Sequence, residues 1–246
     1  MRFFPDIGIA ANMRVLDVGC GNGDLSRTMA ALVGPGGEIV GIDRSESALQ
    51  SARATPSHPD SAAIHYETVD LSKQFPDLGH FDAIVGRRVL MYLPDAAATL
   101  SQLANFAKPG TILAFQEHAR ADLPSGAGDL TLHRQCYEMA WKTVAAEQGD
   151  VTLGYRLANL VRAAGFTLDH AYSEGVLMQP WGQSFLPTLI QVMLPRMIER
   201  GVVAVGEIDP ETLADRIDAE RRGSGHTIVW DLAFLVSGRF AGKAAQ

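Results

Sequence analysis

Cysteine is scarce in this sequence. Only Cys20 and Cys136 occur among 246 residues, and they stand far apart. Disulfide frameworks and zinc sites need cysteines at paired spacings, so neither is expected here. Unpaired thiols are typical of a reducing compartment, and we therefore expect a cytoplasmic protein.

Basic charge and long apolar runs are also in short supply. Lys and Arg number 21 against 28 Asp and Glu, which gives a net charge of −7. This sign disfavours a protein that follows a phosphate backbone, so no nucleic-acid partner is expected. The longest apolar stretches, such as residues 112–115 and 232–236, are far shorter than a membrane span of about 20 residues. With 47% hydrophobic residues, the chain is instead suited to one α/β domain with a full core.

Short apolar strands alternate with helical segments through the first half of the chain. The expected strands cover residues 14–18, 38–42, 64–69, 81–85 and 111–116, and the expected helices cover residues 25–33, 47–53 and 95–107. This alternation predicts an α/β fold with a Rossmann-like, mostly parallel sheet and helices on both faces.

The second half is richer in helix. Helices are expected at residues 130–146, 150–164, 183–199 and 209–221, with strands at 166–177 and 227–234. The two late strands bring the sheet to seven. The late helices predict a helical cap inserted after strand five rather than a second fold.

A glycine loop follows the first strand. Residues 17–23 read Asp-Val-Gly-Cys-Gly-Asn-Gly, and glycine lets the backbone come close to a ligand because it has no Cβ. The spacing Gly-x-Gly-x-Gly differs from the Gly-x-Gly-x-x-Gly of dinucleotide sites, and the lysine of a P-loop is missing. An NAD-dependent oxidoreductase is therefore disfavoured.

A second acid stands at the end of the second strand. Asp43 lies twenty positions after Gly23, where a carboxylate can accept the hydroxyls of a ribose. The alternative is a structural role at the start of a helix near Ser45.

These residues resemble the class I methyltransferases that use S-adenosyl-L-methionine (SAM). Residues 17–23 match the family's first motif, Asp43 matches its ribose acid, and Asp70 matches its adenine acid. Residues 81–86 match its fourth strand, and residues 107–111 match the turn before its fifth. The resemblance implies SAM as cofactor, held by Asp17, Gly19, Cys20, Gly21, Asp43, Arg44, Asp70, Leu71 and Arg87.

The resemblance also assigns roles within this set. The glycines would carry the methionine and ribose part of SAM, and Asp70 and Leu71 the adenine edge, with Arg44 beside it. Arg87 would lie by the methionine end, or be a solvated charge. We expect one methyltransferase domain over residues 1–246, with a SAM-binding core at 12–118 and substrate-side cap segments at 119–165 and 178–226. Only thirteen residues precede the first strand, which leaves the family's lid helix reduced or outside this sequence.

The residues after strand four narrow the acceptor. Residues 86–95 read Gly-Arg-Arg-Val-Leu-Met-Tyr-Leu-Pro-Asp and resemble bacterial methyltransferases for small molecules. The Asn/Asp-Pro-Pro-Tyr/Phe motif of enzymes that methylate DNA bases or glutamine is missing. A small-molecule substrate is therefore expected, and the oligomeric state stays open, a homodimer included.

Candidate acceptor-site residues lie at the end of strand five and on the helix over residues 130–146. Helical spacing places His133, Tyr137 and Trp141 on one inward stripe, with Glu138 and Lys142 as an ion pair on the outer side. The candidate catalytic residues are His118, Glu117 and His133, and the candidate substrate-binding residues are Tyr92, Tyr137 and Trp141. Ordinary core packing is the competing explanation for each inward residue.

The expected reaction is an in-line displacement, because the sulfonium of SAM already activates the methyl group. A base is needed only when the acceptor must lose a proton, and a histidine or a desolvated glutamate suits that task. No metal-ligand cluster is visible, so metal assistance is not expected. A methyltransferase acting on protein or RNA and a non-catalytic SAM-binding module remain as alternatives.

Overall fold

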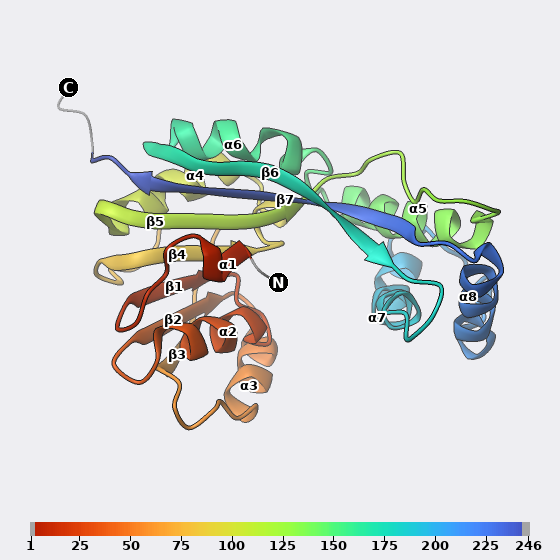
Figure 1. Cartoon of the computed structure of the whole chain (residues 1–246), viewed down its shortest axis with the longest axis horizontal. Helices are drawn as coiled ribbons and strands as arrows, with labels where there is room; N and C mark the ends of the chain where they lie inside the picture. The colour runs from red at the N-terminus through yellow and green to blue at the C-terminus, as the bar shows by residue number, and fades with distance from the viewer. Residues whose placement is uncertain (1–2, 243–246) are drawn as a thin grey trace. The chain divides into compact units, whose positions relative to one another are not determined.

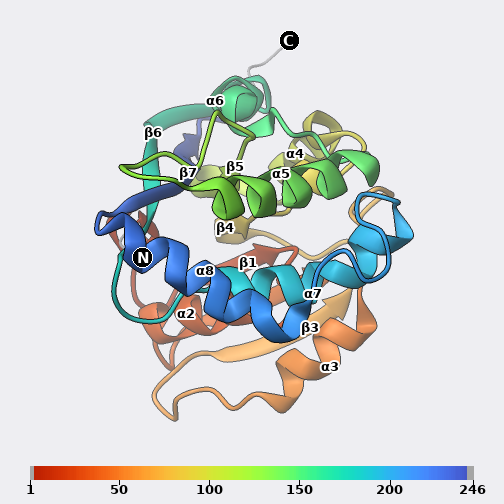
Figure 2. The same cartoon turned by 90° about the vertical axis from the view of Figure 1, so that its right-hand side faces the viewer.

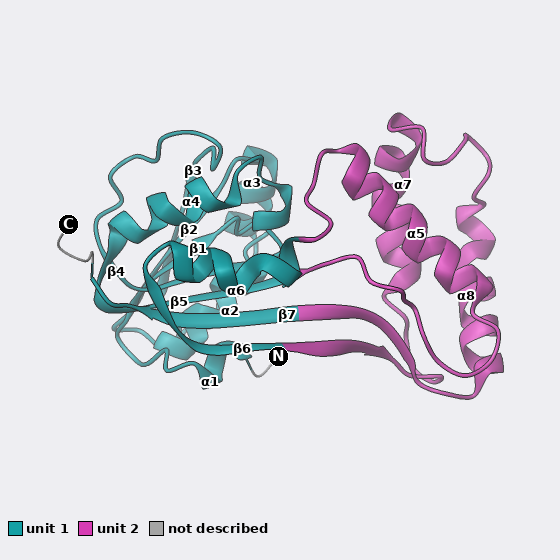
Figure 3. Cartoon of the chain, turned by 90° about the horizontal axis from the view of Figure 1, so that it is seen from above, with its two compact units in different colours: residues 1–117, 153–172, 234–246 teal, residues 118–152, 173–233 magenta. Residues whose placement is uncertain are grey.

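The computed structural model describes residues 3–242, which fall into two compact units (Figure 3). Unit 1 comprises the chain up to residue 117, residues 153–172 and the chain from residue 234. Unit 2 comprises residues 118–152 and 173–233. The helix over residues 153–163, which we expected within a cap segment, is thus part of unit 1.

A seven-stranded sheet organises the chain, as the sequence predicted, and its order is β3-β2-β1-β4-β5-β7-β6. The pairs β1–β2, β1–β4, β2–β3 and β4–β5 are parallel, whereas β7 runs against β6 (Figure 1). The strands are β1 (Arg14–Val18), β2 (Glu38–Asp43), β3 (Ala63–Thr68), β4 (Phe81–Arg87), β5 (Ala107–His118), β6 (Phe166–Met178) and β7 (Ile228–Phe240).

The strand order reverses between β1 and β4. From β1 the chain continues to β2 and β3 on one side, and then returns to β4 on the other. The register pairs Val18 with Ile42 of β2 and with Gly86 of β4, so the carboxyl ends of these strands lie together. In open α/β sheets, a reversal of this kind opens a crevice for ligands at the carboxyl ends.

Helices of unit 1 lie on both faces of the sheet (Figure 3). Two of them begin at a side-chain cap: Ser45 accepts a hydrogen bond from the amide of Ala48, and Asp95 accepts one from that of Ala98. The helices are α1 (Phe3–Asp6), α2 (Asp24–Val33), α3 (Glu46–Ala54), α4 (Ala96–Leu103) and α6 (Leu153–Ala163), with 3₁₀ turns η1 (Leu90–Tyr92) and η2 (Ala104–Phe106).

Unit 2 contains three helices that pack on one another: α5 (Thr131–Ala146), α7 (Leu186–Glu199) and α8 (Pro210–Ser224) (Figure 2). The predicted inward stripe of α5 is confirmed, because His133, Tyr137 and Trp141 are all buried. The predicted ion pair on its outer side is wrong. Glu138 instead receives two hydrogen bonds from the guanidinium of Arg120, both of 2.9 Å, since Arg offers two parallel donors to a carboxylate.

The expected elements agree with the structure apart from their ends. Strand β5 begins at Ala107 rather than at residue 111, and β7 continues to Phe240 rather than ending at residue 234. The turn η1 was not predicted, because a side chain from a distant strand stabilises it, as shown below. Among the described residues, no helix is both long and apolar enough to cross a membrane.

Candidate functional site

The glycine loop that joins β1 to α2 adopts left-handed backbone angles. Gly19, Gly21 and Gly23 have φ of +66°, +53° and +79°, which other residues adopt only with strain. A Cβ on Gly19 would lie 2.2 Å from Cγ2 of Val89, so this glycine permits close packing. A Cβ on Gly21 would meet nothing within 4 Å. The backbone at Gly21 therefore faces open space in which a ligand can lie against it.

Asp43 holds this loop in place. Its Oδ2 accepts a hydrogen bond of 2.9 Å from the amide of Gly21, and its Oδ1 accepts one of 2.9 Å from the amide of Ser45. The amides of Gly19 and Cys20 donate to the carbonyl of Ile42, one residue before Asp43. Because each carboxylate oxygen can accept two hydrogen bonds, the half-buried Asp43 still has acceptor capacity for a hydroxyl pair.

Asp17 is buried beneath the loop. Its Oδ2 accepts a hydrogen bond of 2.6 Å from Ser26 of α2, and its Oδ1 is enclosed without a partner. Burial raises the pKa of Asp17 to about 7, while Ser26 and the nearby positive charge of Arg87 oppose that rise. Arg87, at the end of β4, is thus close enough to Asp17 to act on it electrostatically.

The other predicted cofactor residues follow β2 and β3, except Cys20, which lies in the glycine loop. Asp70 accepts hydrogen bonds from the amide and hydroxyl of Ser72, which lower its pKa to about 2 and keep it ionised. Leu71 is buried, and Arg44 is exposed. Cys20 is buried as well, and burial raises the pKa of its thiol, so its contribution to the loop comes from the backbone.

These features fit the cofactor that the sequence implies. Gly21 offers backbone facing open space, Asp43 offers unused acceptor capacity, and Asp17 offers a buried oxygen without a partner. Together they can receive a ligand that carries ribose hydroxyls and an ammonium group, as SAM does. All of these residues belong to unit 1, and they lie where the strand order reverses.

Glu117 stabilises the turn that follows β4. Its Oε1 accepts hydrogen bonds from the amides of Val89 (2.9 Å) and Leu90 (2.8 Å), at the start of η1. The side chain is fully buried, its Oε2 has no partner, and burial raises its pKa to about 7. Tyr92, the last residue of η1, is 36% exposed. Glu117 therefore fixes the turn that carries Tyr92, and the Oε1 atom of Glu117 is occupied by two amides of that turn.

In unit 2, His118 forms a buried pair with a residue that we had not predicted. Its Nδ1 lies 2.7 Å from Oδ2 of Asp231 on β7. Oδ1 of Asp231 accepts hydrogen bonds from the hydroxyl of Tyr137 (3.3 Å) and from the amide of Leu232 (2.8 Å). Trp230 meets the ring of Tyr137 edge to face. A predicted catalytic residue and a predicted substrate-binding residue thus converge on one carboxylate.

His133, in contrast, is held by a helix-packing contact. Its Nδ1 lies 2.5 Å from Oε2 of Glu220 on α8, and Glu220 also accepts the amides of Leu132 and His133. Nε2 of His133 is enclosed without a partner. This arrangement favours a structural role for His133. Trp141 is buried against Tyr137, with ring centroids 6.1 Å apart.

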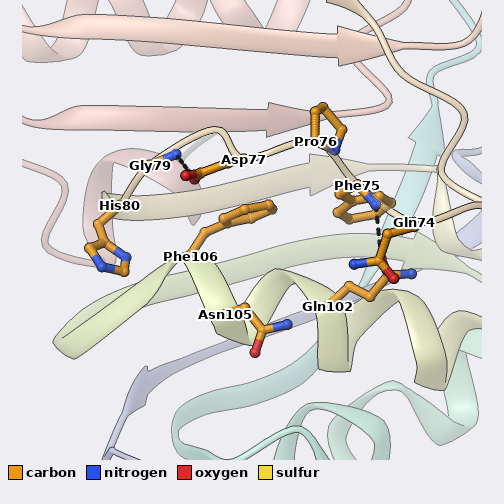
Figure 4. A pocket seen from close by; sticks show the side chains of 9 residues that line it. All are labelled: Gln74, Phe75, Pro76, Asp77, Gly79, His80, Gln102, Asn105 and Phe106. Atoms are coloured by element: carbon orange, nitrogen blue, oxygen red, sulfur yellow. Dashed lines mark hydrogen bonds between the residues drawn. The ribbon is translucent and has the colours of Figure 1, made fainter.

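A separate cavity of about 550 Å³ lies elsewhere in unit 1 (Figure 4). It is bordered by the residues just before β4, such as His80, and by those just before β5, such as Phe106. It is therefore at the amino ends of these strands, whereas the glycine loop follows a carboxyl end. None of the predicted site residues lines it. Within residues 3–242, no three His, Cys, Asp or Glu side chains gather as metal ligands.

Three residues that support the candidate sites were missed from the sequence. Asp231 could have been noticed, because it is the one acid in a mostly apolar strand, and Ser26 less easily, because it lies on the apolar face of α2. Glu220 carried none, since an acid on a polar helix is ordinarily solvated. Only the tertiary contacts reveal what these side chains hold.

Known proteins resemble this chain in sequence and in fold. The methyltransferase domain family matches residues 9–165. The demethylmenaquinone methyltransferase of Staphylococcus aureus is 30% identical over 144 residues, which cover 58% of this chain and 56% of the relative, so the match spans about half of that protein.

Solved structures share the fold at low sequence identity. A proposed methyltransferase from Bacillus halodurans C-125 has a TM-score of 0.62 and 16% identity over 97% of this chain and 96% of that one. A SAM-dependent methyltransferase from Mesorhizobium loti has a TM-score of 0.52 and 22% identity over 94% and 92%. With the family match over most of the chain and the sheet order described above, the chain belongs to the class I SAM-dependent methyltransferases.

Proposed function

We propose that this protein transfers the methyl group of SAM to a small-molecule acceptor with an O, N or C nucleophile. The observation that carries the proposal is the geometry around Gly21. The backbone there faces open space, and its amide donates a hydrogen bond to Asp43. Family membership supports SAM as the ligand for that space. The likeness to a demethylmenaquinone methyltransferase supports a small-molecule acceptor.

The residues of unit 1 would hold SAM in this proposal. Asp43 binds the ribose hydroxyls, Asp70 and Leu71 bind the adenine edge, and Arg87 lies by the methionine end. SAM supplies a methyl group that its sulfonium has already activated. The protein's task is to hold the nucleophile in line with that methyl and to keep water away.

His118 is the proposed proton acceptor for acceptors that must be deprotonated, while Tyr92, Tyr137 and Trp141 contact the acceptor. Glu117 and His133 contribute through structure, because each is already engaged by backbone amides or by a helix-packing contact. A buried imidazole that donates from Nδ1 to a carboxylate keeps the lone pair of its other nitrogen available to a proton.

Calorimetry with SAM and with its demethylated product tests the first step. We expect both to bind, and absence of binding by intact protein would overturn the proposal.

Labelled methyl transfer from SAM into a cell extract, separated by size, tests the acceptor. Label in the small-molecule fraction is expected, whereas label in protein or RNA alone would favour a macromolecular acceptor. Binding without any labelled product would favour a non-catalytic module.

A further inference from the structure

Outside the cofactor loop, His118 and Asp231 form a buried, hydrogen-bonded pair of ionisable side chains. The two residues are 4% and 5% exposed, and their polar atoms lie 2.7 Å apart. An ionised carboxylate can only accept a hydrogen bond, so the imidazole must donate from Nδ1. A neutral His118 then carries its proton on Nδ1 and leaves the lone pair of Nε2 for another group.

The far nitrogen of His118 is the one that could act. Among the described residues, no hydrogen bond reaches Nε2 of His118, and this atom is not one of the enclosed atoms without a partner. Nε2 of His133 is such an enclosed atom. Of the two histidine–carboxylate pairs in unit 2, only the pair with Asp231 keeps an acceptor nitrogen that is neither hydrogen-bonded nor fully enclosed.

Asp231 is itself held in one orientation. Its Oδ1 receives two donors, the hydroxyl of Tyr137 and the amide of Leu232, so its Oδ2 is the oxygen that faces His118. The hydroxyl of Tyr137 in turn accepts the amide of Ala121. These donors orient the carboxylate so that Oδ2 accepts a hydrogen bond from Nδ1 of His118. Nδ1 is therefore the nitrogen that bears the proton.

We propose that Asp231 is a positioning residue that fixes His118 as a base at Nε2, and that the acceptor therefore carries a proton on its attacking atom. This inference rests on the proposed function and names its substrate class: a weakly acidic hydroxyl, such as that of a phenol. Tertiary amines and thioethers have no such proton and need no base. The edge-to-face packing of Tyr137 on Trp230 holds the hydroxyl that orients Asp231.

The step balances within this arrangement. Nε2 takes the hydroxyl proton, and the resulting imidazolium is stabilised by the carboxylate of Asp231. The acceptor oxygen forms the new C–O bond as the C–S bond breaks, and the electron pair of that bond stays on sulfur. The positive charge that the sulfonium loses reappears on His118.

Nitrogen NMR of the protein with labelled histidine tests the positioning without any acceptor. The resonance of His118 is assigned with His118→Gln. We expect neutral His118 in the Nδ1–H form, and a wild-type protein in the Nε2–H form would overturn the proposal. This measurement needs no variant of Asp231, so it remains decisive if such a variant does not fold.

Asp231→Asn gives a sharper test, because the donors Tyr137 and Leu232 require an oxygen at the Oδ1 position. The amide NH₂ group of the substituted side chain must then face Nδ1 of His118 and donate to it. The proton of neutral His118 should move to Nε2, while the form of His133 should not change. An unchanged His118 in Asp231→Asn would contradict the proposal.

Labelled methyl transfer from SAM into a small-molecule extract tests the acceptor class. We expect O-methylated product from the wild type, and a rate lower by about 100-fold in Asp231→Asn, because its Nε2 can no longer accept a proton. Label found only on thioethers or tertiary amines would overturn the acceptor class. Failure of SAM to bind would contradict the proposed function instead, and would leave the NMR result on His118 standing as a separate outcome.

Discussion

At the scale of single residues, two buried carboxyl groups each hold a neighbouring part of the chain in place. Asp17 holds Ser26 of α2, and Glu117 holds the amides that begin η1. Each leaves one oxygen without a partner, and burial raises the pKa of both to about 7. The sequence placed both residues at strand ends, but it did not reveal that Glu117 is committed to a backbone turn.

Glu117 should make the stability of the protein depend on pH. Its pKa rises from 4.5 to about 7 on folding, so the folded chain keeps this proton to higher pH than the unfolded chain. The resulting stabilisation is complete below the unfolded pKa and is lost as pH rises through 7. Glu117→Gln keeps an acceptor oxygen and cannot ionise. Its unfolding free energy relative to the wild type should therefore increase by roughly 3 kcal/mol between pH 4.5 and 8.

Urea denaturation of both proteins across this range measures the difference. Parallel pH profiles for wild type and Glu117→Gln would show that this carboxyl is not the titrating group.

Asp43→Asn should weaken SAM binding. The two amides of Gly21 and Ser45 each need an oxygen, and asparagine supplies only one, so an NH₂ group would face an N–H donor. Loss of one charge-assisted hydrogen bond corresponds to a dissociation constant raised by roughly 10- to 100-fold. Calorimetry with SAM measures this change. Asp60→Asn removes a carboxyl that is 89% exposed and should leave the affinity unchanged.

At the scale of elements, glycine is needed at two positions of the loop after β1 for different reasons, and the Gly-x-Gly-x-Gly pattern does not distinguish them. Gly19 is required because Val89 lies where its side chain would be. Gly21 has no neighbour there, so the packing of this chain does not explain it. Its positive φ of +53° favours glycine, and a ligand lying against the backbone would be a second reason for a residue without a Cβ.

A matched pair of variants separates backbone strain from ligand contact. Gly21 and Gly225 both have positive φ, +53° and +64°, and a Cβ on either one would meet nothing within 4 Å. Alanine at each position should cost about 1 kcal/mol of stability, because the left-handed backbone is strained for alanine. Only Gly21→Ala should also weaken SAM binding, since Gly225 ends α8 in unit 2, whereas the residues proposed to hold SAM belong to unit 1.

Thermal unfolding and SAM calorimetry of the two alanine variants provide the readouts. Equal, wild-type affinity in both would mean that SAM does not contact the backbone at Gly21.

Prediction from the sequence was most accurate for elements whose patterns are local. The alternation of apolar runs and turns located the seven strands, and glycine and proline marked most of their ends. The turn η1 was not predicted, because the side chain that stabilises it, Glu117, lies on β5. Glu117 accepts hydrogen bonds from two amides that are 27 and 28 positions away. The Glu138–Lys142 pair was wrong for a similar reason, since Arg120 lies outside the helix and competes for the same carboxylate.

At the scale of the whole molecule, the chain crosses between the two units four times, and β6 and β7 contribute residues to both. Within unit 2, one acid connects two of the three helices. Glu220 of α8 accepts two amides of the first turn of α5 and also pairs with His133. Those amides have no partner within their own helix.

Glu220→Ala should therefore loosen unit 2 selectively. It leaves two amides and one imidazole nitrogen without their partner, a loss of at least about 2 kcal/mol. Hydrogen exchange should become faster in α5 and α8 and stay unchanged in β1 and β4. Glu211→Ala, an exposed acid on the same helix, is the control. Faster exchange spread evenly over the chain would contradict this local role.

The sequence by itself determined the sheet, the glycine loop, the acids at strand ends and, through their spacing, the family. These features depend on short-range patterns of hydrophobicity, backbone freedom and charge, which are readable along the chain. Only the tertiary structure decided which polar side chains are fully engaged in structural hydrogen bonds and which keep a nitrogen or oxygen free to accept a proton. Asp231 meets His118 from 113 positions away, and Glu220 meets His133 from 87. The partner of a buried polar group is set by how distant elements pack, because burial makes an unpaired polar group costly without specifying which residue satisfies it.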